Sequence, residues 1–222
     1  MSKKTALITG ASRGIGLAVA NRLSKDGIKV LRPTRSELDL LSNASIDAYI
    51  NSMKEDVDIL VNNAGINLLS ALSELSDSNM TDTLQVNLVA PLRITRRIAL
   101  PMMERGFGRI VNVSSIWSVV SKFARVSYSI SKSGINGMTR ALAVEMAPYN
   151  VLVNAVAPGY VNTELTRQNN TEEQLQVIRN NIPAKRLAEP DEIAEVVAFL
   201  CSERNTYITG QVIIVDGGFT CQ

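Results

Sequence analysis

The sequence predicts an α/β fold, a doubly wound parallel sheet with helices on both faces, formed as a single domain over residues 1–222. Short apolar runs alternate with longer segments of helical period, which is typical of a buried parallel sheet covered by helices. A glycine-rich turn stands directly after the first apolar run, where such a sheet turns into its first helix. The 222 residues suffice for one domain that buries its core without disulfides.

Each element follows from one of two patterns. Strands are predicted where an apolar run is short, at residues 5–9, 29–31, 59–62, 109–114, 152–157 and 211–215. Helices are predicted where apolar residues recur with helical spacing, at residues 14–26, 46–54, 80–106, 127–147, 171–180 and 190–202. Right-handed crossovers bring the carboxyl ends of these strands to one edge, where ligands of such sheets bind.

The interval after residues 29–31 is too short for a complete fold of this kind. Pro33-Thr34-Arg35-Ser36 leads directly into Glu37-Leu38-Asp39-Leu40. A complete sheet would place a helix, a further strand and another helix before Asp58, and parallel neighbours need a crossover of about a dozen residues or more. We therefore expect one helix to be missing and strand 3 of the complete fold to be reduced or absent.

Composition argues against several classes of function. The net charge of +2 comes from interspersed Lys and Arg without a basic run, so no nucleic-acid partner is expected. Cys201 and Cys221 lack a metal-ligand spacing and the chain has no histidine, so no metal site is expected. The apolar run after Met1-Ser2-Lys3-Lys4 is too short for a signal peptide or a membrane span. We expect a cytoplasmic protein with reduced thiols and no membrane partner.

The first glycine turn reads Thr9-Gly10-Ala11-Ser12-Arg13-Gly14-Ile15-Gly16. A strand, a tight glycine turn and a helix start together let backbone N–H groups approach a pyrophosphate at the positive end of the helix dipole. The spacing Gly-x-x-x-Gly-x-Gly differs from the Gly-x-Gly-x-x-Gly dinucleotide fingerprint. The turn therefore indicates a dinucleotide site on physical grounds, with ordinary turn glycines at a helix start as the alternative.

The chain resembles the short-chain dehydrogenase/reductase family in six motifs that occur in the family's order. They are the three-then-one glycine spacing, Asn62-Asn63-Ala64-Gly65, Asn87, Ser115, Tyr128 with Lys132, and Pro158-Gly159-Tyr160-Val161-Asn162-Thr163. Val215-Asp216-Gly217-Gly218 is similar to the family's C-terminal end. Among the branches, the chain is most similar to 3-oxoacyl-[acyl-carrier-protein] reductases, with Asp191-Glu192-Ile193-Ala194 opening a late helix as in those enzymes. The resemblance implies a Rossmann-like fold and an NADP-dependent oxidoreductase.

The choice between NAD and NADP depends on the end of the second strand, where an acid suits the ribose of NAD and cations suit the 2′-phosphate of NADP. Thr34 stands where NAD-using relatives carry Asp, Arg35 follows it, and Arg13 can point at the same phosphate, which favours NADP(H). Solvated arginines are the alternative. The resemblance places Asp39 against the adenine. It assigns the rest of the cofactor site to Gly10, Ser12, Gly14, Ile15, Gly16, Asn63, Ala64, Gly65, Tyr128, Lys132, Pro158, Gly159, Val161 and Thr163.

Because there is no histidine, proton transfer falls to Tyr128 and Lys132, both of residue types with pKa values near 10. Residues four apart share a helix face, so the Lys132 ammonium can favour the Tyr128 anion, although making a tyrosine work near neutrality costs about 4 kcal/mol. The resemblance makes Tyr128 the general acid/base and Lys132 the ligand of the nicotinamide ribose. Ser115 would hydrogen-bond the substrate carbonyl, and Asn87 would hold a water that links Lys132 to solvent. Taken singly, each residue has an ordinary structural explanation.

The implied reaction reduces a carbonyl or oxidises the corresponding secondary alcohol, and a 3-oxoacyl thioester on a carrier is one candidate substrate. The substrate wall is expected near Asn67, from Ile116 to Arg125, and over residues 160–188, a polar segment suited to a mobile lid. Lys122 and Arg125 suit an acidic substrate or a carrier protein, but a solvated loop explains them equally well.

Two further questions stay open at this point. The two long helices carry more apolar surface than one sheet face needs, at Leu84, Leu88, Leu92, Ile98, Leu100, Ile135, Met138, Leu142 and Met146. In relatives these helices pair across subunits, which predicts a homotetramer, with a dimer second and burial within one subunit as the alternative. Two other functions compete with carbonyl reduction: a nucleotide-sugar or keto-sugar reductase or epimerase, and a non-catalytic NADP-binding regulator.

Overall fold

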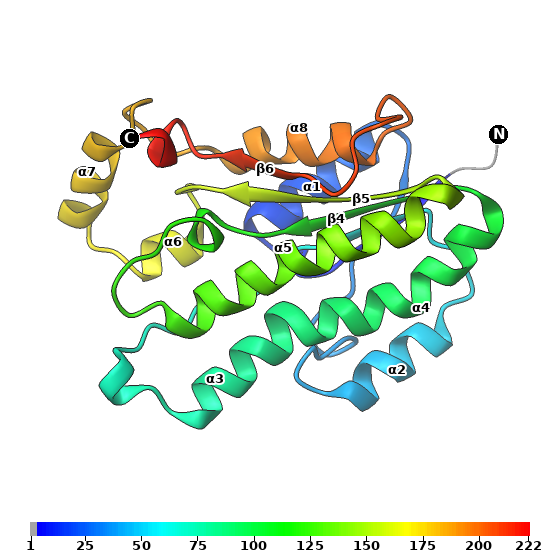
Figure 1. Cartoon of the computed structure of the whole chain (residues 1–222), viewed down its shortest axis with the longest axis horizontal. Coiled ribbons are helices and arrows are strands. Elements are labelled where there is room, and N and C mark those ends of the chain that lie inside the picture. The colour runs from blue at the N-terminus through cyan, green and yellow to red at the C-terminus, as the bar shows by residue number, and fades with distance from the viewer. Residues whose placement is uncertain (1–3) are drawn as a thin grey trace.

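One parallel sheet forms the centre of the computed structural model, which describes residues 4–222 (Figure 1). Its six strands lie in the order β2-β1-β3-β4-β5-β6. They are β1 (Thr5–Ile8), β2 (Lys29–Leu31), β3 (Ile59–Asn62), β4 (Gly108–Val113), β5 (Val151–Pro158) and β6 (Val212–Val215). β1 pairs with both β2 and β3, so the strand order reverses between β1 and β3. The carboxyl ends of β1 and β3 therefore open a crevice at the point where such sheets bind ligands.

Helices cover the sheet on both faces, as Figure 1 shows. α1 (Gly14–Lys25) and α8 (Pro190–Cys201) pack on one face, where Val19, Leu23 and Ile193 are fully buried. α2 (Asn43–Ser52), α4 (Ala90–Arg105) and α5 (Val126–Met146) cover the other face and bury Ile46 and Ile94. The apolar runs of the sequence are therefore strands enclosed from both sides, as predicted.

The shortened interval after β2 contains no further strand. Residues 32–42 form turns and coil, and α2 leads directly into β3. Ser42 starts α2 because its hydroxyl accepts a hydrogen bond from the Ser45 N–H at 3.2 Å. β2 is consequently an edge of the sheet. The predicted doubly wound sheet without strand 3 of the complete fold is confirmed.

The helix predicted over residues 80–106 differs from the structure. It begins earlier, as α3 (Asp77–Leu84), because the Ser76 hydroxyl caps it by accepting the Asn79 N–H at 3.1 Å. A π-helical segment (Gln85–Val89) then interrupts the chain before α4. Such segments widen the helix locally, and Asn87 in its middle bonds to residues outside the helix. The other predicted elements begin and end within three residues of the observed ones.

The segment expected to form a lid contains two helices. α7 (Glu172–Asn181) was predicted, whereas the five-residue α6 (Glu164–Gln168) was missed because it is too short to show a helical period. A small apolar cluster of its own holds the segment against the rest of the protein: Leu175, Ile178, Ile182 and Leu187, with Tyr160 and Phe219 packed on it. Short 3₁₀ turns complete the chain at Leu72–Glu74, Ile116–Ser118, Ala147–Tyr149 and Phe219–Cys221. The mobility of the segment stays a prediction.

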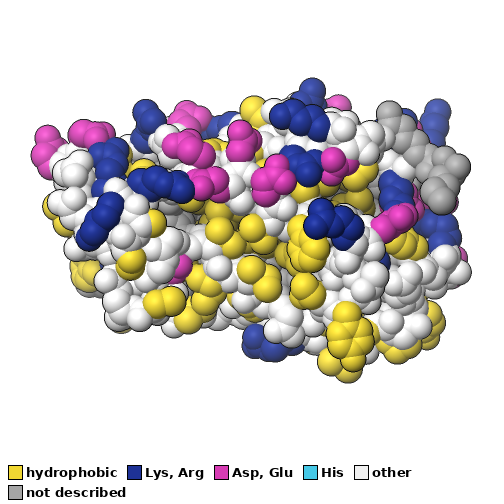
Figure 2. Space-filling model, turned by 90° about the horizontal axis from the view of Figure 1, so that it is seen from above, with side chains coloured by type: hydrophobic (Ala, Val, Ile, Leu, Met, Phe, Trp, Pro, Cys, Tyr) yellow, Lys and Arg dark blue, Asp and Glu magenta, His cyan; other side chains and the backbone are white. Residues whose placement is uncertain are grey.

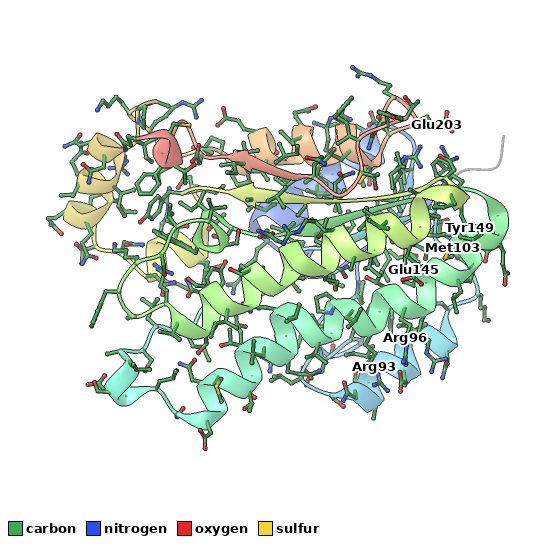
Figure 3. All side chains as sticks on the ribbon, in the orientation of Figure 1. Arg93, Arg96, Met103, Glu145, Tyr149 and Glu203 are labelled. Atoms are coloured by element: carbon green, nitrogen blue, oxygen red, sulfur yellow. The ribbon has the colours of Figure 1, made fainter. Side chains whose placement is uncertain are left out.

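The outer surfaces of α4 and α5 are less apolar than expected. The side chains of Ile98, Ile135, Met138 and Met146 are buried within the subunit, so they need no partner, whereas Leu92 and Leu100 are exposed. On α4, Arg93 and Arg96 lie toward α2 (Figure 3), and Arg93 Nε donates to Asp47 Oδ1 of α2 at 2.9 Å. Fewer apolar residues are therefore available for a contact between subunits than the sequence suggested, and the homotetramer stays a prediction.

Charges of both signs are mixed on the molecular surface. The face seen from above in Figure 2 carries Lys and Arg interspersed with Asp and Glu, with hydrophobic side chains between them. Across residues 4–222, no helix has both the length and the apolar character needed to cross a membrane.

Candidate active site

A groove of about 800 Å³ runs along the carboxyl ends of β1, β3, β4 and β5. It brings together every residue that the sequence assigned to the cofactor or to catalysis, with the exception of Asn87. Those lining residues are Gly10, Ser12, Arg13, Gly14, Ile15, Gly16, Thr34, Arg35, Asp39, Asn63, Ala64, Gly65, Ser115, Tyr128, Lys132, Pro158, Gly159, Val161 and Thr163. Segments from most of the chain's length therefore meet at one edge of the sheet.

The glycine turn packs too closely against the segment after β3 to admit side chains. Gly10 and Gly14 have φ angles of 66° and 56°, in the left-handed region. A Cβ on Gly16 would lie 2.3 Å from the Gly10 carbonyl oxygen, and one on Gly10 would lie 2.8 Å from Ala64 Cα. No side chain caps the start of α1. The exposed N-terminus of α1 in this glycine cradle fits a pyrophosphate.

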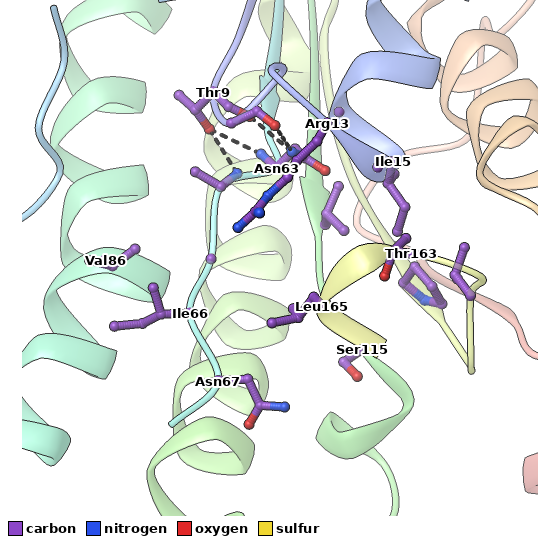
Figure 4. Close-up of a pocket in the computed structure, with 18 of the residues that line it drawn as sticks. Thr9, Arg13, Ile15, Asn63, Ile66, Asn67, Val86, Ser115, Thr163 and Leu165 are labelled. Atoms are coloured by element: carbon purple, nitrogen blue, oxygen red, sulfur yellow. Dashed lines mark hydrogen bonds between the residues drawn. The ribbon is translucent and has the colours of Figure 1, made fainter. Parts of the chain in front are cut away.

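Thr9 and Asn63 fix the shape of this cradle. The Thr9 hydroxyl accepts the backbone N–H groups of Asn63 and Ala64, both at 3.1 Å. The Asn63 amide donates back to the carbonyl oxygens of Thr9 at 3.0 Å and of Gly10 at 2.9 Å (Figure 4). Asn63 is thus a support of the glycine turn, and its amide N–H groups are already engaged. Sequence reasoning missed this role of Thr9, and its position directly after β1, at the start of the glycine turn, is the signal that could have found it.

Thr34, which lines the groove after β2, is bound by an acid that the sequence reasoning missed. Glu37 accepts hydrogen bonds from the Thr34 backbone N–H at 2.7 Å and from the Thr34 hydroxyl at 2.8 Å, and these bonds lower the pKa of Glu37. Arg35 is exposed, with its Nε 3.8 Å from Asp39 Oδ1. The signal for the Thr34–Glu37 turn was the Thr-x-x-Glu spacing of a capping box. Thr34 is therefore engaged within its own turn, and Arg35 is the freer group.

Arg13 pairs with an acid from the other side of the groove. Its Nη1 lies 2.5 Å from Glu164 Oε2 at the start of α6, and both side chains are more than half exposed. Exposed pairs of this kind contribute at most about 1 kcal/mol. Glu164 was missed because it is 151 residues from Arg13 in the sequence and opens a helix that was not predicted.

The segment after β5 covers the glycine turn. A Cβ on Gly159 would lie 2.8 Å from Asp216 Cα, so only glycine fits there. Val161 is buried and pairs with Ala188 in an isolated bridge. Thr163 Cγ2 would lie 3.3 Å from a Cβ on Gly14, and Figure 4 shows Thr163 close to Ile15 on this side of the groove. The loop and the glycine turn therefore enclose the groove between them.

Ser115, Tyr128 and Lys132 converge beyond the carboxyl end of β4. Ser115 opens the 3₁₀ turn after β4, Tyr128 stands in the first turn of α5, and Lys132 lies one turn later on the same helix face. Lys132 is buried and its Nζ donates to the Val113 carbonyl oxygen at 2.8 Å. The same Nζ lies 5.6 Å from the centre of the Tyr128 ring. The three side chains share one end of the groove, where Figure 4 shows Ser115.

The electrostatics of this end differ from the sequence expectation that Lys132 acidifies Tyr128. Burial raises the pKa of the Tyr128 phenol, and the groups that lower it are the Ser115 hydroxyl and the Arg125 guanidinium. Burial also lowers the pKa of the Lys132 ammonium to about 8. The difference from the expectation arises because the Lys132 ammonium is poorly solvated and directs its Nζ at the Val113 carbonyl. The protein alone therefore holds a neutral phenol at neutral pH, the form that donates a proton.

Asn87 lies outside the groove and joins two elements behind it. Its Oδ1 accepts the Ile66 N–H at 2.9 Å, and its Nδ2 donates to the Ile66 carbonyl at 2.9 Å and to Ser131 Oγ at 3.1 Å. A Cβ on Gly65 would lie 3.2 Å from Asn87 Oδ1 and 3.5 Å from Lys132 Nζ, so both groups lie against Gly65. Asn87 thus ties the segment after β3 to α5. Its expected role in holding a water stays a prediction.

These features define a class of protein. A doubly wound parallel sheet that ends in a glycine cradle beside a tyrosine and a buried lysine is the frame of a nicotinamide-dependent oxidoreductase. The comparison with known proteins agrees with this class.

Residues 33–220 match the family model described as Enoyl-(Acyl carrier protein) reductase. The 3-oxoacyl-[acyl-carrier-protein] reductase of Aquifex aeolicus (strain VF5) is 39% identical in an alignment of 240 positions, gaps included, that spans 97% of this chain and 96% of the relative. A gluconate 5-dehydrogenase from Burkholderia cenocepacia J2315, solved with NADP and tartrate, is 27% identical with a TM-score of 0.89, over 100% of this chain and 97% of that one. A 4-hydroxyisoleucine dehydrogenase mutant, solved with NADH and succinate, is 28% identical with a TM-score of 0.94, over 99% of each chain. The chain therefore belongs to the short-chain dehydrogenase/reductase family.

Proposed function

We propose that this oxidoreductase reduces a substrate carbonyl with NADP(H), or oxidises the corresponding secondary alcohol, with Tyr128 as the general acid/base. The observation that carries the proposal is the place of Tyr128 in the groove, where it shares the lining with Ser115, whose hydroxyl lowers the Tyr128 pKa, and stands one helical turn from Lys132. The chain contains no histidine to take this role. Burial keeps the phenol protonated, which suits the direction of carbonyl reduction.

The chemistry divides between the cofactor and the protein. NADPH, when bound along the groove, supplies the hydride that reduces the carbonyl carbon. Tyr128 gives its phenolic proton to the carbonyl oxygen, while the Ser115 hydroxyl stabilises the negative charge that develops there. Loss of that proton leaves a phenolate, which a charged Lys132 stabilises. After reduction, a water next to Lys132, held by Asn87, resupplies the proton to Tyr128. In the oxidative direction Tyr128 takes the proton from the alcohol and releases it to solvent by the same route.

The preference for NADP(H) over NAD(H) rests on two arginines. Arg13 of the glycine turn and Arg35 of the segment after β2 both line the groove, and a guanidinium matches the oxygens of a 2′-phosphate. Glu164 competes with that phosphate for Arg13, and Glu37 adds a second negative charge nearby. The preference for NADP(H) is therefore expected to be moderate. The relatives' titles name both NADP and NADH.

Two substrate classes follow from the relatives' names. The Aquifex relative is named as a reductase of 3-oxoacyl groups on a carrier protein, and the solved relatives are named for gluconate and 4-hydroxyisoleucine, both hydroxy acids. A small-molecule carbonyl or alcohol, free or attached to a carrier, is the common element. The segment over residues 160–188 is proposed to close on this substrate, because it is attached through its own small apolar cluster.

The setting of the enzyme is part of the same proposal. A cytoplasmic location is supported by Cys201 and Cys221, which are unpaired. A homotetramer, with a dimer as the second choice, is supported by the exposed Leu92 and Leu100 of α4 and Val144 of α5.

The test follows NADPH absorbance with ketones, 3-oxoacyl thioesters and keto-sugars, with NADH in parallel. Turnover of at least one carbonyl, faster with NADPH than with NADH, is the expected result. Tight NADPH binding without any net consumption would favour the regulator or an epimerase, which regenerates its cofactor in each cycle, and turnover confined to keto-sugars would favour the sugar reductase. Equal rates with NADH would contradict the argument from Arg13 and Arg35.

A further inference from the structure

Arg125 is a buried cation that the protein leaves without a partner. The side chain lies in the groove and is 93% buried, with a relative exposure of 7%. Within residues 4–222 its guanidinium forms no ion pair and no hydrogen bond to protein, and its buried Nε is unsatisfied. A buried charge without a counterion costs several kcal/mol, so such groups are normally paired.

The other buried arginine of this chain shows what a structural role looks like. Arg109 is 3% exposed, and its guanidinium donates to the carbonyl oxygens of Gly108 at 2.8 Å, Asn150 at 3.0 Å and Asn205 at 3.0 Å. These bonds hold the ends of neighbouring loops together. Arg125 holds no loop in this way, because the contact between its segment and Ser70 runs through backbone groups, Ser70 N–H to Ala124 carbonyl at 3.2 Å. Support of the fold therefore does not account for its guanidinium.

An aromatic ring, not a carboxylate, lies against the Arg125 guanidinium. Its Cζ lies 5.0 Å from the centre of the Trp117 ring, and Trp117, Tyr160 and Phe219 pack edge to face with centres 5.6 to 6.3 Å apart. The face of the Trp117 ring stabilises the cation. Burial lowers the pKa of Arg125, and the Tyr160 and Tyr128 phenols act in the opposite direction. A guanidinium stays charged in proteins, so it keeps its full attraction for an anion.

The position of Arg125 sets which part of a ligand it can meet. It stands three residues before Tyr128, and its charge is close enough to lower the pKa of that phenol. Asn67, which also lines the groove, has a buried Oδ1 without a hydrogen-bond partner, so a second polar group is open to the ligand. Figure 4 shows Asn67 and Ser115 at the same end of the groove. An anion on Arg125 therefore belongs to the same small molecule whose carbonyl meets Tyr128.

We infer that Arg125 binds the free carboxylate of the substrate, so that the enzyme acts on small oxo acids and their hydroxy-acid counterparts rather than on neutral ketones or thioesters. The planar guanidinium matches a carboxylate through two parallel N–H···O bonds. This inference rests on the proposed carbonyl reduction and names its substrate class. The atoms balance as before: hydride to carbon, the Tyr128 proton to oxygen, and the carboxylate unchanged.

The direct test compares matched substrates that differ only in the carboxylate. Wild-type enzyme with NADPH is assayed on 2-oxobutanoate, 3-oxobutanoate and 4-oxopentanoate, on the methyl ester of each, and on a 3-oxoacyl thioester of N-acetylcysteamine. The best acid is expected to exceed its ester in kcat/KM by about tenfold to a hundredfold, because a charge-assisted hydrogen bond is lost with the ester. Esters or thioesters turned over as well as the acids would overturn the inference while leaving carbonyl reduction standing.

Two variants locate the effect on the enzyme. Arg125→Gln is expected to collapse the acid-to-ester ratio, mainly through KM for the acids. Lys122→Gln is the matched control, because Lys122 is an exposed cation on the same loop, and its ratio should match wild type. An unchanged ratio in Arg125→Gln contradicts the inference. Should Arg125→Gln fail to fold, Arg125→Lys keeps the charge without the fork, and the wild-type acid-to-ester ratio decides by itself.

A binding measurement separates this inference from the proposed reaction. Glutarate, which has no reducible carbonyl, should raise the Tm of the wild-type NADPH complex by about 2–4 °C at saturating concentration. Dimethyl glutarate should not, and glutarate should fail with Arg125→Gln. Glutarate binding without turnover of any carbonyl would keep the carboxylate site and reject the reductase. Absence of any glutarate effect in wild type would reject the site, whatever the turnover.

Discussion

Replacing Lys132 by Met tests the electrostatics of the site through protein stability. Burial lowers the pKa of Lys132 to about 8 from its ordinary 10.5, and the side chain is 4% exposed. The folded pKa is below the unfolded one, so the unfolded chain binds more protons between these values. The charge therefore destabilises the wild-type fold at low pH, by about 3 kcal/mol, and the penalty is lost as pH rises from about 8 to about 10.5.

The measurement is urea unfolding of both proteins, without cofactor, at a pH of about 6.5 and about 9.5. Met fills a similar volume but removes the hydrogen bond to the Val113 carbonyl, and that loss is the same at both pH values. The difference in unfolding free energy, Lys132→Met minus wild type, should therefore be about 2 kcal/mol larger at the lower pH. A difference that does not change with pH, or that grows at the higher pH, would refute the buried-ammonium reasoning.

Two further changes test the cofactor end of the groove. Gly16→Ala places a Cβ against the Gly10 carbonyl oxygen, so it should lower the unfolding free energy by about 2 kcal/mol and weaken NADPH binding more than about tenfold. The control is Gly137→Ala, whose Cβ meets open space within α5 and which should stabilise the fold by about 0.5–1 kcal/mol. Equal effects of the two changes would contradict the close packing of the glycine turn. Glu164→Gln frees Arg13 and should lower the dissociation constant of NADPH by about two- to fivefold, with little change in that of NADH, as measured by fluorescence titration. Weaker NADPH binding would show that the ion pair supports the site instead.

The fold could be predicted from the sequence because its elements bury apolar faces with a regular period. The run before Thr9 has only strand length, and the interval after β2 has room for one helix, so both the sheet and its missing strand follow from counting residues. The π-helical segment around Asn87 could not be predicted, because the side-chain contacts of Asn87 with Ile66 and Ser131 exist only in the folded chain and leave no periodic signal in the sequence.

The candidate site was predictable where residues follow one another along the chain, and less so where distant segments meet. Glu164 faces Arg13 only because α6 folds over the glycine turn. Lys122 and Arg125 are both cations of one loop in the sequence, yet Lys122 is exposed and Arg125 is buried. Only burial distinguishes Arg125, as a candidate ligand-binding residue, from a solvated surface charge. Helical spacing shows that Lys132 is near Tyr128, but it shows neither that the Lys132 Nζ points at a carbonyl nor that burial raises the pKa of the Tyr128 phenol.

The most direct test of the central claim is the effect of Tyr128→Phe on turnover, measured with saturating NADPH on a carbonyl that the wild type reduces. The change removes one hydroxyl and leaves the ring, so the fold and the NADPH dissociation constant should be kept. The loss of the proton donor should lower kcat by about 10²- to 10⁴-fold. A kcat within about threefold of wild type, with NADPH bound equally well, would contradict the assignment of Tyr128 as the general acid.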